Sequence, residues 1–214
     1  MDKAKLKIQQ FKQREQAILD AALELLLEQG EDKVTVEQIA DKVDIGKGTI
    51  YKHFTSKTEI YVRLLSDYEN DLKAKLDDAV KLAEAGDYNA PARVYFSHSV
   101  EDPIKARLFQ RLEEKMIAND EEPEKRANLE HARRDAFDTL NACYAKGIEV
   151  GRLKDVPPYF YYLSYWALTQ GAVELYYNPY CRSLVSEEQF PDLLKFIKDI
   201  GTHIGVDPAL SRTK

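Results

Sequence analysis

Cysteine is scarce in this 214-residue sequence, and its scarcity narrows the chemistry that the chain can perform. The two cysteines, Cys143 and Cys181, stand far apart and match no metal-binding or redox spacing. We interpret both as buried or incidental thiols in preference to a disulfide or a redox sensor. So few thiols suit a reducing compartment, and we expect the protein to be cytoplasmic.

Long apolar runs are also missing. The longest aromatic stretch, 159–177, contains Ser164, Gln170 and Glu174, and a membrane would bury these polar groups at a considerable cost in free energy. The lysine-rich start is followed by glutamines, where a signal peptide would have an apolar segment. The sequence therefore predicts no membrane partner and places the aromatic stretch in a helix buried by protein.

An excess of positive charge is absent too, because the formal net charge is −6. A nucleic-acid-binding protein with this balance must concentrate its basic residues locally. Residues 1–14 do so, with five lysines and arginines against Asp2 alone, and residues 46–57 hold three lysines and no acid. The remaining charge we interpret as solvated helix surface.

Residue groups that would carry catalysis are likewise missing. The histidines are scattered, and none has a helical partner at metal-ligand spacing: His53, His98, His131 and His203. The segment 46–49 resembles a phosphate-binding loop only superficially, because Asp41 replaces its first glycine and Gly48 its Ser or Thr. We predict no catalytic residue, no metal and no cofactor; an all-α enzyme is a third interpretation, behind those given below.

Alternating strand patterns are short everywhere and the hydrophobic period is helical almost throughout, so the sequence predicts an all-α fold. A first helix is expected to end near Gly30, and two short helices to follow, one through Val43 and one over about 47–54. A long helix should run over 57–84, and further helices should begin at 103, 123, 158 and 186. Capping boxes of the form Ser/Thr-x-x-Glu/Gln, at 35–38 and 56–59, open the first short helix and the long one.

Two short helices joined by a tight turn meet the geometric requirement of helix-turn-helix DNA binding, in which the first helix braces the second in the major groove. Ala40 is small enough for a close crossing, and Ile50 can fill the core between the two helices. The second helix then presents a polar outer face: Lys47, Gly48, Thr49, Lys52 and His53. Lysines and hydroxyls at a helix N-terminus suit phosphate oxygens. The alternative at this point is the surface of an arbitrary helical hairpin.

The run TVEQIADKVDIGKGTIYKHFTSKTEIY, residues 35–61, resembles the DNA-binding signature of the tetracycline-repressor (TetR) family of regulators. The shared elements are Ile39-Ala40, Gly48-Thr49-Ile50-Tyr51, Phe54 and Lys57, and the resemblance extends over about 12–65. It implies DNA contacts at Thr35, Lys47, Gly48, Thr49, Tyr51, His53 and Lys57, to which the outward-facing Lys52 is added. Tyr51 and Lys57 would contact chiefly phosphates, whereas 47–49 would lie nearest the base edges. Tyr51 could instead be core, and His53 could merely end its helix.

Two positions depart from the family pattern. Asp44 stands where the family usually has a glycine in the turn, and Asp tolerates the left-handed conformation at modest cost. Gly46 stands where many members have a capping serine, so the second helix lacks a hydroxyl there. The basic arm, residues 1–12, resembles extensions that some members lay on DNA; a disordered solubilising tail is the equal alternative.

The resemblance implies a C-terminal helical domain that forms homodimers and binds a small-molecule effector. The domains would be 1–60 for DNA binding and 61–214 for effector binding and dimerisation. The last two strongly apolar helices would pair across a two-fold axis; the alternative is that both simply form the core of a monomer. The predicted interface residues are Tyr161, Tyr165, Tyr176, Leu193, Phe196, Ile197 and Ile200. Candidate effector contacts, each of which could be plain core, are Phe96, His98, Phe109, Met116, Phe137, Tyr144, Trp166 and Gln170. Their composition suggests a largely apolar or aromatic effector.

The sequence as a whole therefore predicts a homodimeric transcriptional repressor that a small ligand releases from a palindromic operator in double-stranded DNA. The motion would pass through the long helix 57–84. The alternative is an all-α ligand-binding or carrier protein without operator binding, and the lysines at 47, 52 and 57 count against it.

Overall fold

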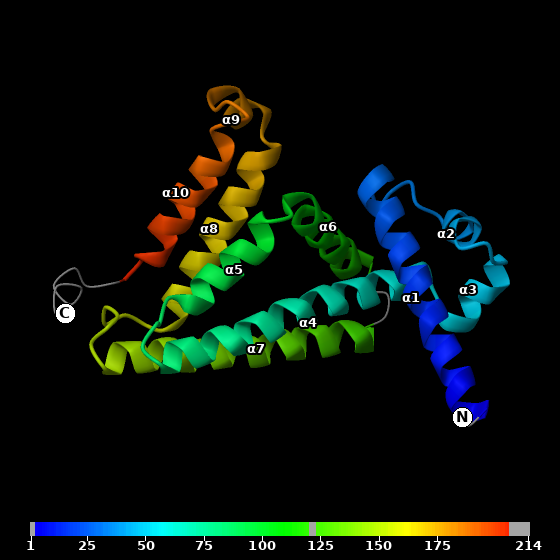
Figure 1. The fold of residues 1–214 in the computed structure, drawn as a ribbon, viewed down its shortest axis with the longest axis horizontal. Coiled ribbons are helices and arrows are strands. Elements are labelled where there is room, and N and C mark those ends of the chain that lie inside the picture. Colours follow the sequence, from blue (N-terminus) through cyan, green and yellow to red (C-terminus); the bar gives the residue numbers. More distant parts are fainter. Residues whose placement is uncertain (1–2, 120–122, 206–214) are drawn as a thin grey trace. The chain divides into compact units, whose positions relative to one another are not determined.

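The computed structural model describes residues 3–119 and 123–205, and within these residues the chain forms α-helices and no strand (Figure 1). The predicted all-α fold is thereby confirmed. The helices are α1 (Lys3–Gln29), α2 (Val36–Lys42), α3 (Lys47–His53), α4 (Lys57–Glu84), α5 (Ala90–Val100), α6 (Pro103–Asn119), α7 (Pro123–Glu149), α8 (Tyr159–Tyr177), α9 (Pro179–Leu184) and α10 (Phe190–Thr202).

Two compact units share these helices. Unit 1 contains the chain up to Tyr68 together with 107–129, and unit 2 contains 69–106 together with the chain from Glu130 onward. Helices α4, α6 and α7 therefore contribute residues to both units. This division describes packing; the division into functional domains at residue 60 stays a prediction.

Helix α2 begins where the capping box predicted. The Thr35 Oγ1 accepts a hydrogen bond from the Gln38 backbone N–H at 3.2 Å, and the Gln38 Oε1 accepts one from the Thr35 N–H at 2.8 Å. At the start of α4, the Ser56 Oγ accepts the Glu59 N–H at 2.9 Å. The Glu59 carboxylate also reaches one residue further back, where it accepts the Thr55 hydroxyl at 2.6 Å.

The turn between α2 and α3 depends on one strained residue. Asp44 has a φ of +53°, the left-handed conformation that its short polar side chain tolerates. The following N–H, of Ile45, donates to the Ala40 carbonyl oxygen at 3.0 Å and closes the turn. Ile18 of α1, Ile39 of α2 and Ile50 of α3 are buried together in the core of unit 1, which holds the three helices as one body.

Unit 2 has an aromatic core in which α5 packs against α8 and α10. Tyr144 of α7 and Tyr161 of α8 stack with their ring centroids 5.3 Å apart, and the Tyr161 hydroxyl donates to the Lys154 carbonyl at 2.9 Å. The Tyr165 hydroxyl is 3.3 Å from the Asn89 Oδ1. Tyr161 and Tyr165 therefore each keep a polar partner for the hydroxyl while the ring fills the core.

The structure corrects the sequence predictions at both ends of the described chain. Helix α1 begins at Lys3, so residues 3–12 are helical and the disordered-tail alternative is wrong for them. Helix α10 begins at Phe190 and not at Ser186, because the Ser186 hydroxyl caps a turn that precedes it, accepting the Gln189 N–H at 3.3 Å. Helices α5 and α9 were not separately predicted.

Two kinds of feature are absent from the described ranges, 3–119 and 123–205. None of their helices is both long enough and apolar enough to cross a membrane. Nor do the described side chains include a group of three or more His, Cys, Asp or Glu placed to hold a metal ion.

Candidate nucleic-acid interface

Helix α3 has one face fixed in the core and one face open to solvent. Ile50 and, just after the helix, Phe54 are buried, which seats α3 against the rest of unit 1. On the other side the polar residues predicted to contact DNA are exposed or half-buried: Lys47, Gly48, Thr49, Tyr51 and Lys52. A Cβ added at Gly48 would meet no atom within 4 Å, so the backbone there is open to close approach.

Lys47, at the start of α3, is tied to the preceding helix. Its ammonium forms an ion pair with the carboxylate of Glu37 in α2, which raises the pKa of Lys47 and lowers that of Glu37. Both side chains are about half exposed, so the pair is accessible to solvent and weak. The ammonium also lies 5.8 Å from the centre of the Tyr51 ring. A DNA phosphate would have to compete with Glu37 for this lysine.

Thr35 and Tyr51 are both exposed. The Thr35 hydroxyl accepts the capping hydrogen bond of α2 and also hydrogen-bonds to the Glu37 carboxylate, so a DNA phosphate would have to compete with Glu37 here as well. The Tyr51 side chain is 45% exposed, which excludes the alternative that it is core.

His53, at the end of α3, is half-buried against α1. Its ring lies 4.1 Å from that of Phe11, at 32° between the planes. The Nδ1 is buried, and no described residue hydrogen-bonds to it. Burial lowers the pKa of His53, so the ring is neutral near pH 7. His53 is therefore not fully part of the exposed outer face of α3, and its predicted DNA contact stays a prediction.

Lys57, at the start of α4, is partly buried against the protein, and its predicted phosphate contact stays a prediction. The Nζ donates to the Glu31 carbonyl oxygen at 3.4 Å and lies 5.3 Å from the centre of the Tyr61 ring. Burial lowers the pKa of this lysine. The side chain packs along the protein with only part of its surface in solvent, as long basic side chains often do.

Sequence reasoning missed the buried acid beside Lys57. Glu31 is 7% exposed, and its carboxylate lies 3.9 Å from both Arg111 and Lys115 of α6. Its backbone carbonyl accepts the Tyr61 hydroxyl at 3.2 Å. The partners of Glu31, with Lys57 among them, lie 26 to 84 positions away along the chain, so no local pattern could have shown this cluster.

The predicted dimer residues divide between core and surface. Tyr161 and Tyr165 are buried in the core of unit 2 by their own chain, so they have almost no surface left for a partner. This corrects the prediction for these two residues, whereas the interface itself stays a prediction. Phe196 and Ile200 of α10 are exposed, and Tyr176, Leu193 and Ile197 are half-buried.

The eight predicted effector contacts do not form one cluster. Phe109 and Met116 belong to the core of unit 1, and Trp166 is exposed on α8. The others lie in unit 2, buried or half-buried: Phe96, His98, Phe137, Tyr144 and Gln170. Helical spacing indicated the inward-facing residues except at Trp166, but it could not assign them to separate units.

A short helix pair braced by a longer one, with its polar outer face presented by the second short helix, is the helix-turn-helix class of nucleic-acid-binding fold. Comparisons with known proteins narrow this class to a family. Residues 18–64 match the family described as bacterial regulatory proteins, tetR family. The uncharacterized regulator TtgW of Pseudomonas putida is 37% identical over 62 residues, 29% of this chain and 46% of its own.

Other relatives agree in this region. YdeS of Bacillus subtilis, another uncharacterized helix-turn-helix regulator, is 50% identical over 44 residues, 21% of this chain and 22% of its own. TcmR of Streptomyces glaucescens is 41% identical over 64 residues, 30% of this chain and 28% of its own. These sequence matches thus span less than half of each relative's length.

The likeness of fold extends over most of the chain. A TetR/AcrR-family regulator from Thermobifida fusca has a TM-score of 0.67 at 18% identity, covering 89% of this chain and 97% of its own. The ketosteroid regulator KstR2 of Mycobacterium tuberculosis has a TM-score of 0.66 at 20% identity, covering 91% and 95%. Residues 18–64 thus match the tetR family of bacterial regulatory proteins, and over most of the chain the fold is that of these solved regulators.

Proposed function

We propose that this protein is a homodimeric transcriptional repressor that binds a palindromic operator and is released from it by a small molecule. The observation that carries the proposal is the exposed, basic outer face of α3 on a braced helix-turn-helix. Lys47 and Lys52 supply charge for phosphates, and Thr49 and the open backbone at Gly48 lie where base edges would be read. Such a protein acts where the bacterial chromosome lies, in the cytoplasm.

Exposed apolar side chains on α8 and α10 support the dimer. Phe160, Leu163 and Trp166 follow one another at three-residue spacing on α8, and each is about half exposed. Phe196 and Ile200 stand one turn apart on α10, which lies beside α8 (Figure 1). Large apolar residues gathered on two adjacent helices mark an interface, since water disfavours such a patch. A two-fold dimer through this face would present two copies of α3 about 34 Å apart, one turn of DNA.

An aromatic cluster in unit 2 supports a largely apolar effector. Phe137 of α7 meets Tyr162 of α8 edge to face at 5.0 Å, and Tyr95 of α5 lies 6.4 Å from Tyr162. One turn along α7 from Phe137, the Asn141 Oδ1 is buried, and no described residue hydrogen-bonds to it. An apolar wall with a few buried polar atoms is typical of ligand sites. FadR of Bacillus subtilis, with a TM-score of 0.63 at 18% identity, covering 87% of this chain and 97% of its own, was solved in complex with stearoyl-CoA. By analogy, we propose that the effector here carries a large apolar group.

Release follows from linkage between the two sites. An effector that favours a conformation with a different spacing of the two α3 helices weakens DNA binding by its differential affinity for the two conformations. A coupling of about 1–3 kcal/mol lowers the DNA affinity roughly 5- to 150-fold.

Fluorescence anisotropy tests the proposal, with the DNA upstream of the protein's own gene, shuffled DNA and a salt series. We expect tight binding that prefers the natural sequence and weakens steeply with salt. Tyr51→Phe should weaken binding to both DNAs, whereas Thr49→Ala should alter base preference. If selection from genomic fragments also yielded no preferred DNA, the proposal would fail.

A further inference from the structure

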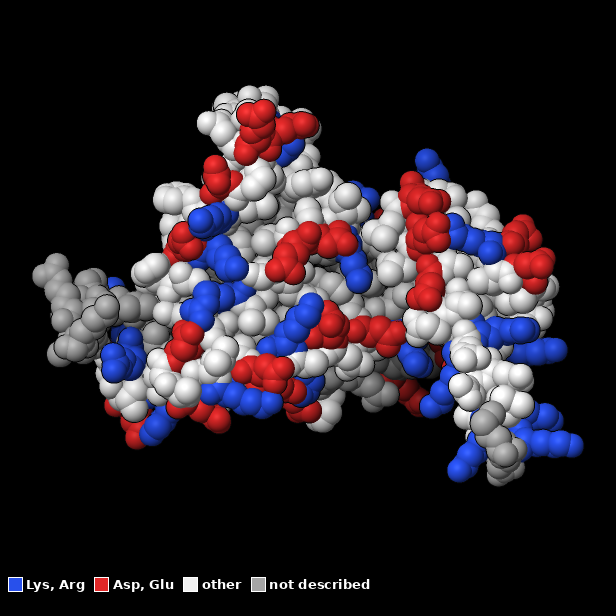
Figure 2. Space-filling view, viewed as in Figure 1, with Lys and Arg blue, Asp and Glu red and all other residues white. Residues whose placement is uncertain are grey.

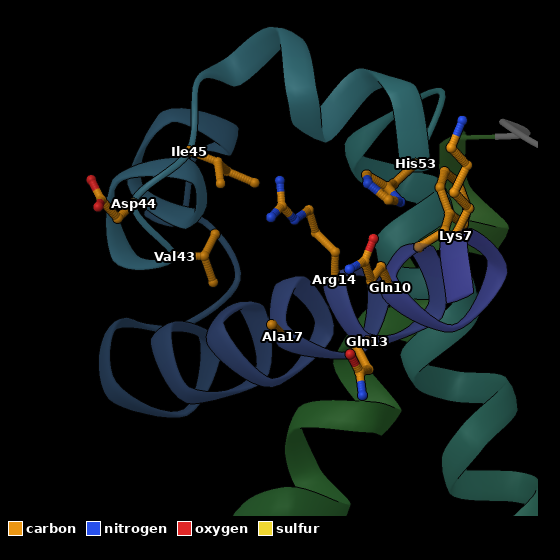
Figure 3. A pocket seen from close by; sticks show the side chains of 10 residues that line it. Lys7, Gln10, Gln13, Arg14, Ala17, Val43, Asp44, Ile45 and His53 are labelled. Carbon is orange, nitrogen blue, oxygen red and sulfur yellow. The ribbon is translucent and has the colours of Figure 1, made fainter. Parts of the chain in front are cut away.

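A groove of about 780 Å³ lies within unit 1, between α1 and the helix-turn-helix (Figure 3). Three segments form its walls. Helix α1 contributes Lys7, Gln10, Phe11, Gln13, Arg14 and Ala17; the turn before α3 contributes Val43, Asp44 and Ile45; and α3 contributes His53. The volume lies within the range of about 300–1,000 Å³ that is typical of ligand sites.

The polar groups in this groove are mainly donors. Lys7 and Arg14 are positively charged, Gln10 and Gln13 carry amides, and Asp44 is the one acid among the lining residues. The Arg14 side chain extends into the space between Ile45 and His53 (Figure 3). Among the residues that the structure describes, Arg14 has no ion pair or hydrogen bond, so its planar guanidinium fork is available to an anion.

The residues around the groove add to its positive charge. Residues 3–14 contain five lysines and arginines and no acid, and they are all helical. Figure 2 shows their blue side chains gathered on the first turns of α1, near the N-terminus. The Phe11–His53 contact, 4.1 Å between ring centres, ties this basic segment to α3. A helix holds its charges at set positions, which a disordered basic tail does not.

We propose that this groove binds phosphate groups, with Arg14 as the main anchor and Lys7 as the second cation. Val43, Ile45 and Phe11 supply apolar surface beside the two cations. The phosphate group could come from two sources. One is the backbone of DNA held by α3, and this part of the proposal rests on the proposed function. The other is a free phosphate compound. Because His53 belongs to both α3 and the groove, the DNA backbone next to α3, the helix proposed to read the bases, is the nearer source of a phosphate group.

A pair of double variants isolates the groove from general charge. Lys7→Gln with Arg14→Gln removes both cations from the groove, while Lys5→Gln with Lys12→Gln removes the same charge from the same exposed helix outside it. Binding to a random-sequence duplex is measured by anisotropy across a salt series, so no operator is needed. We expect the groove variant to lose roughly tenfold in affinity, and its salt slope to fall by about 0.9 per lost phosphate contact. The control should lose far less, and Arg14→Lys, which keeps the charge without the fork, should be intermediate.

Thermal unfolding with pyrophosphate distinguishes the two sources. If DNA binding by the two double variants is alike, but pyrophosphate raises the melting temperature of the control and not of the groove variant, the groove binds free phosphate compounds. If the two variants behave alike in both assays, the groove proposal is overturned. That result leaves the proposed function intact wherever Thr49→Ala still alters base preference, so the two failures are separable.

Discussion

Single side chains at the helix-turn-helix that are predicted to contact DNA also make contacts within the protein. Lys57 is predicted to contact a phosphate, yet its stem packs over Tyr61 and its ammonium reaches the Glu31 carbonyl. His53 closes one wall of a groove while ending α3. Substitutions at these residues therefore change stability as well as DNA affinity, and the two effects have to be measured separately.

Lys57→Ala should lower the free energy of unfolding by about 1–2 kcal/mol, since it removes packed methylene groups and a hydrogen bond. Urea unfolding followed by circular dichroism measures this change. Lys52→Ala, in an exposed position of α3, is the matched control and should stay within about 0.5 kcal/mol of the wild type. Equal stability of the two variants would contradict the packing role of Lys57.

Protonation of His53 should destabilise the fold. Burial lowers its pKa in the folded state, with Arg14 lowering it further and Glu15 opposing, while the unfolded chain keeps the ordinary value of about 6.5. Below that value the unfolded state binds the proton first, so this contribution to stability is present above about pH 6.5 and is lost as the pH falls towards the folded-state pKa. Urea unfolding at pH 7.5 and 5.5 should therefore show a smaller decrease in stability for His53→Gln than for the wild type. His98, whose pKa burial also lowers, is present in both proteins and cancels in this comparison.

At the scale of elements, the turn between α2 and α3 determines the direction of α3. Asp44 carries the left-handed conformation, Ile45 closes the turn through its N–H, and Gly46 starts α3 without a side-chain cap. The two short helices have seven residues each, too few to be stable alone, so their helicity depends on this turn and on burial of Ile39 and Ile50.

Substitution of Asp44 should test the strain directly. Asp44→Gly should leave the stability unchanged or raise it by up to about 1 kcal/mol, because glycine adopts a positive φ without a steric penalty. Asp44→Val should lower it by about 1–2 kcal/mol, since a β-branched residue disfavours this conformation. Thermal unfolding of both variants provides the measurement. A glycine variant less stable than the valine variant would show that the Asp44 side chain, and not its φ, matters.

At the scale of the whole molecule, the outer face of α8 and α10 should control assembly. Phe196→Glu places a charge among exposed apolar residues, and burying that charge in an interface would cost more than the contact returns. We expect the mass measured by light scattering to fall from dimer to monomer. Leu82→Glu, an equally drastic change at an exposed position of α4, should leave the mass unchanged. A dimer that survives Phe196→Glu would place the interface elsewhere.

Most of the fold and the position of α3 in the sequence could be predicted from local sequence. Capping at Thr35 and Ser56, the strained Asp44 and the buried Ile50 depend on residues a few positions apart, and the structure confirms them. Residues 3–12 were harder, because a basic segment without a strong apolar face has similar local preferences as a helix and as a tail.

The sequence by itself determined the helical class and the motif, since periodicity and capping act within a turn or two of helix. Tertiary structure alone decided which apolar residues are core and which are surface: Tyr161 is buried in unit 2, whereas Trp166, on the same aromatic helix, is exposed. It also decided that Phe109 and Met116 join the core of unit 1, that Lys57 meets Glu31, and that Arg14 faces the turn before α3 across a groove. The physical reason is that the local sequence of a helix that is apolar on several sides does not specify which side packs against which neighbour. Contacts between distant segments form only when the helices pack.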